Sequence, residues 1–318
     1  MQLVAYVLKC APCSPPASSL SVKKGQEAMF DQVVFAGGGG RCTWQAGFWK
    51  AVSAEMELQP RVVSAVSAGA LMSCLIHTQD SEQAMARFCE AFAQNGKNFN
   101  LGNLVRRKRV FPHYELYEST MRSLFKDAFR HLRDAPEIRI GVSHPPSWLP
   151  PYAALAVGIA AYNVDKHVRK ALHPAIARRI GFQASFFRAQ DCSSADELVS
   201  LILKSSCTPP FTPLLSTAGG RPILDGGIVD NVPVDGIDNR AGSVLVLLTR
   251  PYKHLPQIFT RARNAQQLLY IQPSQPVPVR SWDYTRPDLV EKTFALGKAD
   301  GMHFLKQFDR RPCQGIAA

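Results

Sequence analysis

Hydrophobic positions along the chain alternate between short apolar runs and segments with helical spacing. Residues 32–36 (QVVFA) and 61–66 (RVVSAV) are short apolar runs that predict buried strands. Each is followed by a predicted helix, because apolar residues recur at four-residue spacing over residues 44–57 and residues 68–77 are almost all apolar or small. This strand, loop and helix order, repeated, predicts two neighbouring parallel strands whose carboxyl ends open on one edge of a sheet.

The same two patterns predict further elements. They indicate helices over residues 81–94, 114–132, 195–205 and 289–305, and strands over residues 137–142 and 243–249. Prolines exclude a helix or an inner strand over residues 144–151, so a surface loop is expected there. Trp148 and Leu149 in that loop either pack on the protein, shield a cleft or insert into a membrane. Residues 250–286 are polar and rich in proline, and no element is predicted within them.

Composition bounds the domain organisation. The chain has 318 residues, of which 46% are hydrophobic and 19% charged, as in an ordinary packed globular protein. Residues 1–28 are expected to be a disordered tail, because residues 9–28 are rich in Ser, Pro, Lys and Ala, and residues 29–318 are expected to form a single domain. No apolar run reaches the ~20 residues that span a bilayer, and the apolar patch near the start is shorter than a signal core, so secretion is not expected.

Charge and cysteine content narrow the cellular setting. Lysine and arginine outnumber acidic residues 37 to 25, and the formal net charge of +12 favours an anionic surface, either lipid or nucleic acid. The eight cysteines are scattered, unlike a disulfide framework, so a reducing compartment is expected. The pair Cys10 and Cys13 forms the one CxxC sequence, and without a second pair it predicts neither a metal site nor redox chemistry.

Three segments carry residues suited to acyl transfer. Residues 36–47 read AGGGGRCTWQAG, and consecutive glycines let backbone N–H groups approach a ligand oxygen with no Cβ in the way. Ser67 lies between small residues where a strand turns into a helix, which can expose its hydroxyl as a nucleophile. Asp225, before Gly226 and Gly227, supplies a carboxylate that can take the proton of that hydroxyl.

Each of these residues also has a purely structural interpretation. Ser67 could cap the helix that it precedes, since serine is a preferred N-cap residue. Asp225 and its glycines could form only a turn, and Arg41 could pair with an acid or with carbonyl groups of the loop. The order and the flanking residues of the three segments, taken together, favour the catalytic interpretation.

In this order the three segments resemble the patatin-like phospholipases, whose hallmarks are a GGGx[RK]G loop, a GxSxG elbow and a DG[GA] motif. They stand here as residues 37–42 (GGGGRC), 65–69 (AVSAG) and 225–227 (DGG). The likeness covers roughly residues 30–248 and, more weakly, residues 283–301. Cys42 and Ala65 replace glycines of the family pattern, so a positive φ at either position would be strained.

The resemblance implies a three-layer α/β fold in which a mostly parallel central sheet is flanked by helices, as one catalytic domain over residues 29–318. It implies a lipid acyl hydrolase of the phospholipase A or lysophospholipase type, which cleaves carboxylic esters through an acyl-enzyme. A phospholipid or lysophospholipid substrate and an anionic membrane surface are the expected partners, and no nucleic acid is expected. The expected location is the cytoplasm, with peripheral contact to a membrane.

The resemblance also assigns roles to residues of this chain. Ser67 is the expected nucleophile and Asp225 the expected general base, so that no histidine, cofactor or metal ion is required. Backbone amides are the expected oxyanion donors. They belong to Gly38, Gly39 and Gly40, with Gly37 and Arg41 in support.

Three alternatives remain open from the sequence. A Ser, Asp, His triad would need a histidine after Asp225, and His254 and His303 qualify. A nucleotide-binding protein of the Rossmann type could use the glycine loop, with Glu55 or Glu57 near the position of a ribose carboxylate, but Cys42 stands where its third glycine belongs. A catalytically silent lipid-binding protein of the same fold is the third.

Overall fold

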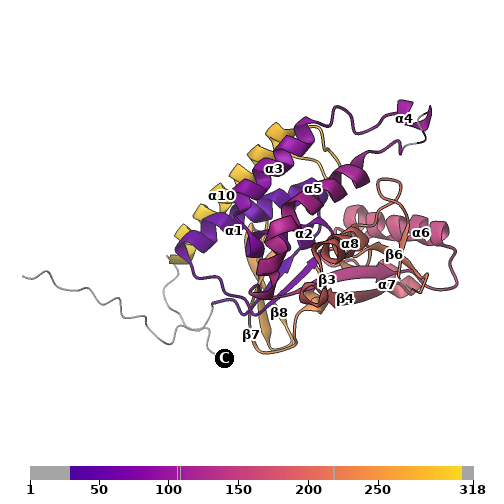
Figure 1. Ribbon diagram of the computed structural model, residues 1–318. Helices are drawn as coiled ribbons and strands as arrows, with labels where there is room; N and C mark the ends of the chain where they lie inside the picture. Colours follow the sequence, from indigo (N-terminus) through magenta and orange to yellow (C-terminus); the bar gives the residue numbers. More distant parts are fainter. Residues whose placement is uncertain (1–28, 106, 108, 218, 310–318) are drawn as a thin grey trace, which may run out of the picture.

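The structure is a computed structural model of the chain and describes residues 29–105, 107, 109–217 and 219–309 (Figure 1). The predicted tail over residues 1–28 lies outside the described residues. Helices pack around a central sheet whose middle strands are parallel, which confirms the predicted α/β fold.

The described residues form a mixed sheet of nine strands in the order β5-β6-β3-β2-β1-β7-β9-β8, with β4 also paired to β3. Strands β1, β2, β3, β7 and β9 run parallel to their neighbours in this series, whereas β4, β5, β6 and β8 are antiparallel. The strands are β1 (Gln32–Phe35), β2 (Val62–Val66), β3 (Glu137–His144), β4 (Gln183–Arg188), β5 (Leu215–Ser216), β6 (Pro222–Asp225), β7 (Gly242–Leu247), β8 (Ile258–Arg263) and β9 (Gln266–Ile271).

Six α-helices of the described residues contribute to the main hydrophobic core. They are α1 (Thr43–Glu55), α2 (Ala68–Thr78), α3 (Ser81–Ala93), α5 (His113–Ala128), α8 (Ala195–Ser205) and α10 (Pro287–Asp309). The remaining α-helices are α4 (Gly102–Val105), α6 (Pro151–Asn163), α7 (Ile176–Ile180) and α9 (Gly227–Asp230). Short 3₁₀ or π turns are η1 (Gly39–Cys42), η2 (Phe129–Arg133), η3 (Val164–Val168), η4 (Ala189–Asp191) and η5 (Val234–Gly236).

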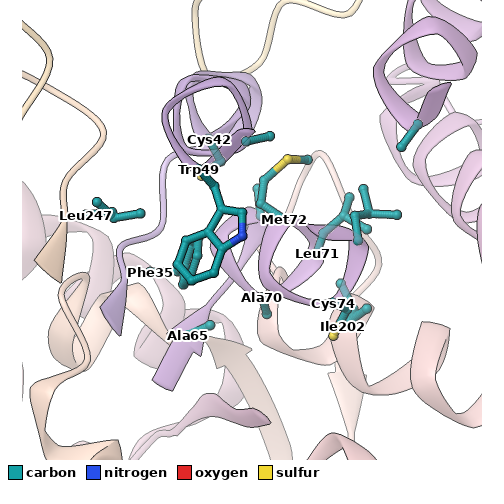
Figure 2. Packing of buried hydrophobic residues seen from close by; sticks show 14 of the residues in the cluster. Phe35, Cys42, Trp49, Ala65, Ala70, Leu71, Met72, Cys74, Ile202 and Leu247 are labelled. Carbon is teal, nitrogen blue, oxygen red and sulfur yellow. The ribbon is translucent and has the colours of Figure 1, made fainter. Parts of the chain in front are cut away.

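The two faces of the sheet belong to different hydrophobic clusters. In β1, Val33 and Phe35 join the large cluster under α1 and α2, whereas Val34 joins a smaller cluster on the opposite face, as the two-residue period of a strand requires. Figure 2 shows the indole of Trp49, from α1, against Phe35, and their ring centroids are 5.8 Å apart. The near-continuous apolar sequence of β1 follows from this burial on both faces.

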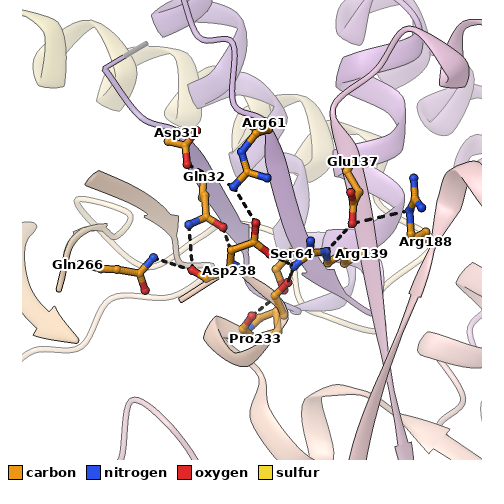
Figure 3. A network of polar contacts seen from close by, with 11 residues as sticks. Asp31, Gln32, Arg61, Ser64, Glu137, Arg139, Arg188, Pro233, Asp238 and Gln266 are labelled. Atoms are coloured by element: carbon orange, nitrogen blue, oxygen red, sulfur yellow. Dashed lines mark hydrogen bonds and ion pairs between the residues drawn. The ribbon is translucent and has the colours of Figure 1, made fainter. Parts of the chain in front are cut away.

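A network of charged residues ties the amino-terminal ends of the parallel strands together (Figure 3). The carboxylate of Asp238 forms ion pairs of 2.7 Å with Arg61, just before β2, and with Arg139 in β3. Arg139 also contacts Glu137 at 2.7 Å. These contacts hold the sheet edge opposite to the one on which the glycine loop and Ser67 open.

The predicted strands and helices are present, with boundaries that differ by a few residues, and three differences have a physical cause. Strand β3 continues to His144 because β4 and β6 pair with its last residues. Helix α6 begins at Pro151, since proline is tolerated in the first turn of a helix. Strands β8 and β9 lie within residues 250–286, where β8 is a half-exposed edge strand without a clear apolar pattern.

The loop before α6 leaves Trp148 exposed, at 69% relative accessibility, whereas Leu149 packs against buried side chains. None of the helices in the described part of the chain is both long and apolar enough to cross a membrane.

Candidate active site

Ser67 lies at the sharp turn between β2 and α2. Its backbone has φ 54° and ψ −137°, a region that a serine rarely adopts, so the turn is strained. The side chain of Ser67 makes no capping hydrogen bond to α2, which removes the capping interpretation. Position 69 requires glycine, because a Cβ there would lie 2.6 Å from the carbonyl oxygen of Ala36. The small residues of this segment thus let α2 start directly against the end of β1.

The backbone of Ser67 is held by another serine. The N–H of Ser67 donates to Ser205 Oγ at 2.7 Å, and the Ser205 hydroxyl donates to the Gly141 carbonyl at 2.6 Å. Ser205 is completely buried at the end of α8. The sequence patterns do not reveal this contact, because it joins residues of two separate elements.

The pairing register of β3 places Asp225 next to the end of β2. Strand β2 pairs with β3 up to Val66 opposite Gly141, and β6 pairs with the next residue of β3, with Asp225 opposite Val142. Strand β4 pairs with one edge of β3 over residues 139–144, so β2 and β6 both pair with the opposite edge, one after the other. The residue after Val66 is Ser67, so the register brings the serine and the aspartate to the same place.

The carboxylate of Asp225 has three neighbouring donors. The Gly227 N–H donates to Oδ1 at 2.7 Å, and the Thr208 hydroxyl donates to Oδ2 at 3.3 Å. Burial raises the pKa of Asp225 to about 6, and hydrogen bonds from Ser67, Gly227 and Thr208 oppose that rise. The carboxylate is therefore ionised at neutral pH but is a stronger base than an exposed aspartate.

The glycine loop runs beside Ser67 from the end of β1. The Gly37 N–H donates to the Asn231 carbonyl at 3.0 Å, and the Gly37 carbonyl accepts from Asn231 Nδ2 and Thr249 Oγ1 at 2.9 and 2.7 Å. Gly39 has φ 59°, and a Cβ there would collide with the Ser281 carbonyl oxygen, so glycine is required at this position.

The three predicted oxyanion donors differ in their surroundings. Gly38 and Gly39 line the same cleft as Ser67 and Asp225. The Gly40 N–H instead donates to the Ser281 carbonyl at 3.1 Å, so in this conformation its hydrogen is already engaged. Gly38 and Gly39 are therefore the two glycines of the loop that are best placed to receive a developing negative charge.

The two replacements of family glycines cause no backbone strain. Cys42, the last residue of η1 and the N-cap of α1, has φ −65° and ψ −15°, and its buried thiol contacts the Ala36 carbonyl at 3.6 Å. Ala65 lies inside the regular strand β2. Since neither position has a positive φ, a small side chain replaces glycine without penalty.

Arg41 lies half-buried at the edge of the cleft. Its Nε donates to the Gly38 carbonyl at 3.1 Å, which is the loop contact that the sequence allowed. Among the described residues it forms no ion pair, and burial lowers the pKa of its guanidinium. A guanidinium that supports the loop and has no carboxylate partner among the residues that the structure describes leaves positive charge at the cleft.

The cleft has a volume of about 330 Å³ and joins residues from distant parts of the chain. Phe211 and Trp282 form one wall, with their rings stacked at a centroid distance of 4.6 Å. Ile159, Tyr162 and Lys166, from α6 and the π turn η3, form another. Sequence reasoning did not single out these wall residues, because aromatic and aliphatic residues at such positions look like ordinary core.

The two histidines that follow Asp225 in the sequence do not line the cleft, whereas His113 contacts one of its walls. His254 is exposed beside Tyr252, and His303 is exposed on α10, where its Nε2 contacts Gln307. His113 is buried, and its Nε2 contacts the Trp282 carbonyl at 2.9 Å. Within the part of the chain that the structure describes, no group of three or more His, Cys, Asp or Glu side chains could hold a metal ion.

Comparison with known families agrees with this geometry. The model of the patatin-like phospholipase family matches residues 33–238, a range that includes the glycine loop, Ser67 and Asp225. The chain belongs to the patatin-like phospholipase family. This membership supports a lipid acyl hydrolase and sets aside the nucleotide-binding interpretation of the glycine loop. A comparison with curated protein sequences finds no match.

Two solved structures similar to this patatin-like chain are VipD from Legionella pneumophila and human GIVD cytosolic phospholipase A2. VipD has a TM-score of 0.45 and 13% identity, and the alignment covers 88% of this chain and 67% of VipD. The human enzyme has a TM-score of 0.45 and 11% identity, with 91% and 64% coverage. The chain thus spans about two thirds of the length of each protein.

Proposed function

We propose that this patatin-like protein hydrolyses carboxylic ester bonds of phospholipids or lysophospholipids through a dyad of Ser67 and Asp225. The observation that carries the proposal is the junction of β2, β3 and β6, at which a strained serine and a carboxylate with a raised pKa line one cleft. A strained backbone at a cleft is typical of functional residues.

In the proposed reaction, the Ser67 oxygen attacks the acyl carbon while Asp225 accepts the proton of the Ser67 hydroxyl. The bond from the acyl carbon to the alcohol of the lipid then breaks, the alcohol leaves with a proton from Asp225, and an acyl-Ser67 ester remains. Water, deprotonated by Asp225, then attacks this ester, the bond from the acyl carbon to the Ser67 oxygen breaks, and Ser67 takes the proton back from Asp225 as the fatty acid leaves. The raised pKa suits the two proton transfers, because a base with a pKa nearer to neutrality both accepts and returns a proton readily.

The oxyanion of each tetrahedral intermediate would be held by the amides of Gly38 and Gly39. Gly40 and Gly37 would support the loop through their contacts to Ser281 and Asn231, and Arg41 through the Gly38 carbonyl. Such donors commonly contribute about 3 kcal/mol to lowering the barrier.

A glycerophospholipid or lysophospholipid is the proposed substrate class, and an anionic membrane is the proposed site of action. The family and the net charge of +12 support both. The cleft is mostly apolar, with Arg41 and Lys166 at its edge, as an acyl chain joined to an anionic headgroup requires.

A fluorophosphonate probe tests the nucleophile directly. We expect covalent labelling of wild-type protein at Ser67, located by mass spectrometry of peptides, and no labelling of Ser67→Ala. Wild-type protein that resists the probe while it binds lipid would support a catalytically silent lipid-binding protein instead.

A further inference from the structure

Helix α6 presents an unusual amount of apolar surface to solvent. None of its thirteen residues, Pro151–Asn163, is charged, yet only Ala154, Gly158 and Ala161 are buried. The helix lies at the outer edge of the molecule, away from the layer formed by α1, α3 and α10 (Figure 1). A surface helix of a globular protein usually carries polar residues on its outer side.

The residues of α6 and η3 divide into three faces. Ala154, Gly158, Ala161 and Asp165 face the protein and are buried. Ile159, Tyr162 and Lys166 line the cleft that contains Ser67. The outward residues include Tyr152, Val164 and Val168, with relative accessibilities of 75%, 42% and 73%, and the exposed Trp148 precedes them. One helix therefore has a face toward the cleft and an adjoining apolar face toward solvent.

Positive charge lies at the carboxyl-terminal end of this segment, where Lys170 follows Val168. Lys166, Lys170, Arg250 and Lys253 line a recess of about 220 Å³, together with Tyr252 and His254, and none of the described acidic residues lines it. Asp165, the acidic residue next to Lys166, is engaged by Arg169 at 2.7 Å and by the amides of residues 175 and 176. Within the described part of the chain these four cations form no ion pair, and Arg41 and Arg250 add to burial in lowering the pKa of Lys166 to about 8.

The positive charge beside the apolar face indicates a partner that is negatively charged. An apolar strip with uncompensated cations at one end fits the surface of an anionic bilayer, where apolar side chains enter the acyl boundary and lysines meet headgroup phosphates. Tryptophan and tyrosine suit this boundary, because each joins an apolar ring to a polar group. The adjoining face of the same helix lines the cleft, so contact at this face would hold the cleft against the membrane.

We infer that the outward face of α6 and η3, formed by Trp148, Tyr152, Val164 and Val168 and bordered by Lys170 and Lys253, docks the protein onto an anionic lipid bilayer. The choice of a bilayer as partner rests on the proposed function, since a phospholipid hydrolase meets its substrate there. Docking would guide a lipid from the bilayer into the cleft between α6 and the glycine loop.

The first test measures binding to sedimented vesicles of phosphatidylcholine with and without phosphatidylglycerol. The variant Tyr152→Ser/Val164→Ser/Val168→Ser should bind the anionic vesicles at least about tenfold more weakly than wild type, because it removes most of the apolar contact. Met302→Ser is the matched control, since Met302 is also an exposed apolar residue, on α10, and it should bind as wild type does. Equal binding by the triple variant and wild type would overturn the inference.

The second test concerns charge. Lys170→Gln/Lys253→Gln should weaken binding to phosphatidylglycerol-containing vesicles by about fivefold for each lysine, and salt should reduce the difference. Lys126→Gln, which removes an exposed lysine on α5, is the control and should have no effect.

The fluorescence of Trp148 should also be quenched by lipids brominated in their acyl chains, and Trp148→Phe should lose that quenching. Absence of acyl-chain quenching would contradict docking through this face.

Hydrolysis of a short-chain soluble ester separates this inference from the proposed function. The docking variants should retain wild-type rates on that ester, because their residues lie outside the cleft. If wild type shows no hydrolysis but binds vesicles through α6, the proposed function fails and the inference stands. If light scattering shows that wild type forms a dimer which the triple variant cannot form, a second copy covers the face and the inference fails.

Discussion

Ser205 accepts the backbone N–H of Ser67 at 2.7 Å and donates its own hydrogen to the Gly141 carbonyl at 2.6 Å. This bridge links the turn after β2 to strand β3, and β3 also pairs with the strand that carries Asp225. A residue in α8 thereby fixes the separation of the proposed nucleophile and base. We expect such a bridge to matter because Ser67 has a strained backbone that relaxes unless its surroundings hold it.

Ser205→Ala should lower kcat by about tenfold to a hundredfold with little change in KM, because the serine moves relative to Asp225 while the walls of the cleft persist. The unsatisfied Ser67 N–H should also cost about 1–3 kcal/mol in the free energy of unfolding. Steady-state kinetics on a soluble ester and urea unfolding check the two effects. Ser119→Ala, which removes an exposed hydroxyl on α5, is the control. A change in KM alone would argue against a positioning role.

The glycine loop makes a separate prediction. Gly39→Ala should abolish fluorophosphonate labelling and destabilise the protein by about 1–3 kcal/mol, because the new methyl group meets the Ser281 carbonyl and φ 59° disfavours alanine. Gly96→Ala is matched to it, since a Cβ at residue 96 meets no atom within 4 Å, and it should label normally. Normal labelling of Gly39→Ala would show that the loop has another active conformation.

The raised pKa of Asp225 predicts a pH profile. A general base must be ionised, so kcat/KM on an uncharged ester should rise tenfold per pH unit up to about pH 6 and level off above it. The His254→Ala and His303→Ala variants should keep this profile. A rate that is constant between pH 5 and pH 7, or a profile that either histidine variant removes, would contradict the assignment of the base.

The raised pKa of Asp225 also predicts that replacing this residue by asparagine stabilises the folded protein at neutral pH. Because burial raises the pKa of Asp225 from 3.8 to about 6, the protonated form favours folding, and this contribution is lost as the pH rises through that range. Asp225→Asn should therefore raise the free energy of unfolding at pH 7.5 by about 1–3 kcal/mol, and the gain should vanish at pH 4. Urea unfolding at both pH values checks this, with Asp127→Asn, an exposed residue on α5, as control. Destabilisation at pH 7.5 would mean that the ionised carboxylate stabilises the fold.

Local patterns were sufficient to predict the elements around Ser67. An apolar run, a turn of small residues and a second apolar segment each depend on neighbours in sequence, and β2 and α2 lie where these patterns place them. Strand β8 was missed because it is an edge strand whose half-exposed residues carry no two-residue apolar period, and the buried strand β9 was missed because its short apolar run lies in a segment rich in proline and polar residues.

The contacts that complete the site could not be predicted in this way. The position of Asp225 depends on which residue of β3 it faces, and no local pattern fixes that register. Ser205, Trp282 and Lys166 reach the site only through the packing of α8, the segment before α10 and the turn after α6. The motif resemblance supplied Ser67 and Asp225, whereas the walls of the cleft required the folded chain.

Hydrolysis of mixed-chain phosphatidylcholine and phosphatidylglycerol vesicles is the most direct measurement of the central claim. Fatty acid and lysophospholipid released by wild type, Ser67→Ala and Asp225→Asn would be quantified by mass spectrometry, with circular dichroism to confirm that each variant is folded. We predict release by wild type and a fall of at least about a thousandfold in both variants. Release at the wild-type rate by either folded variant would contradict the dyad.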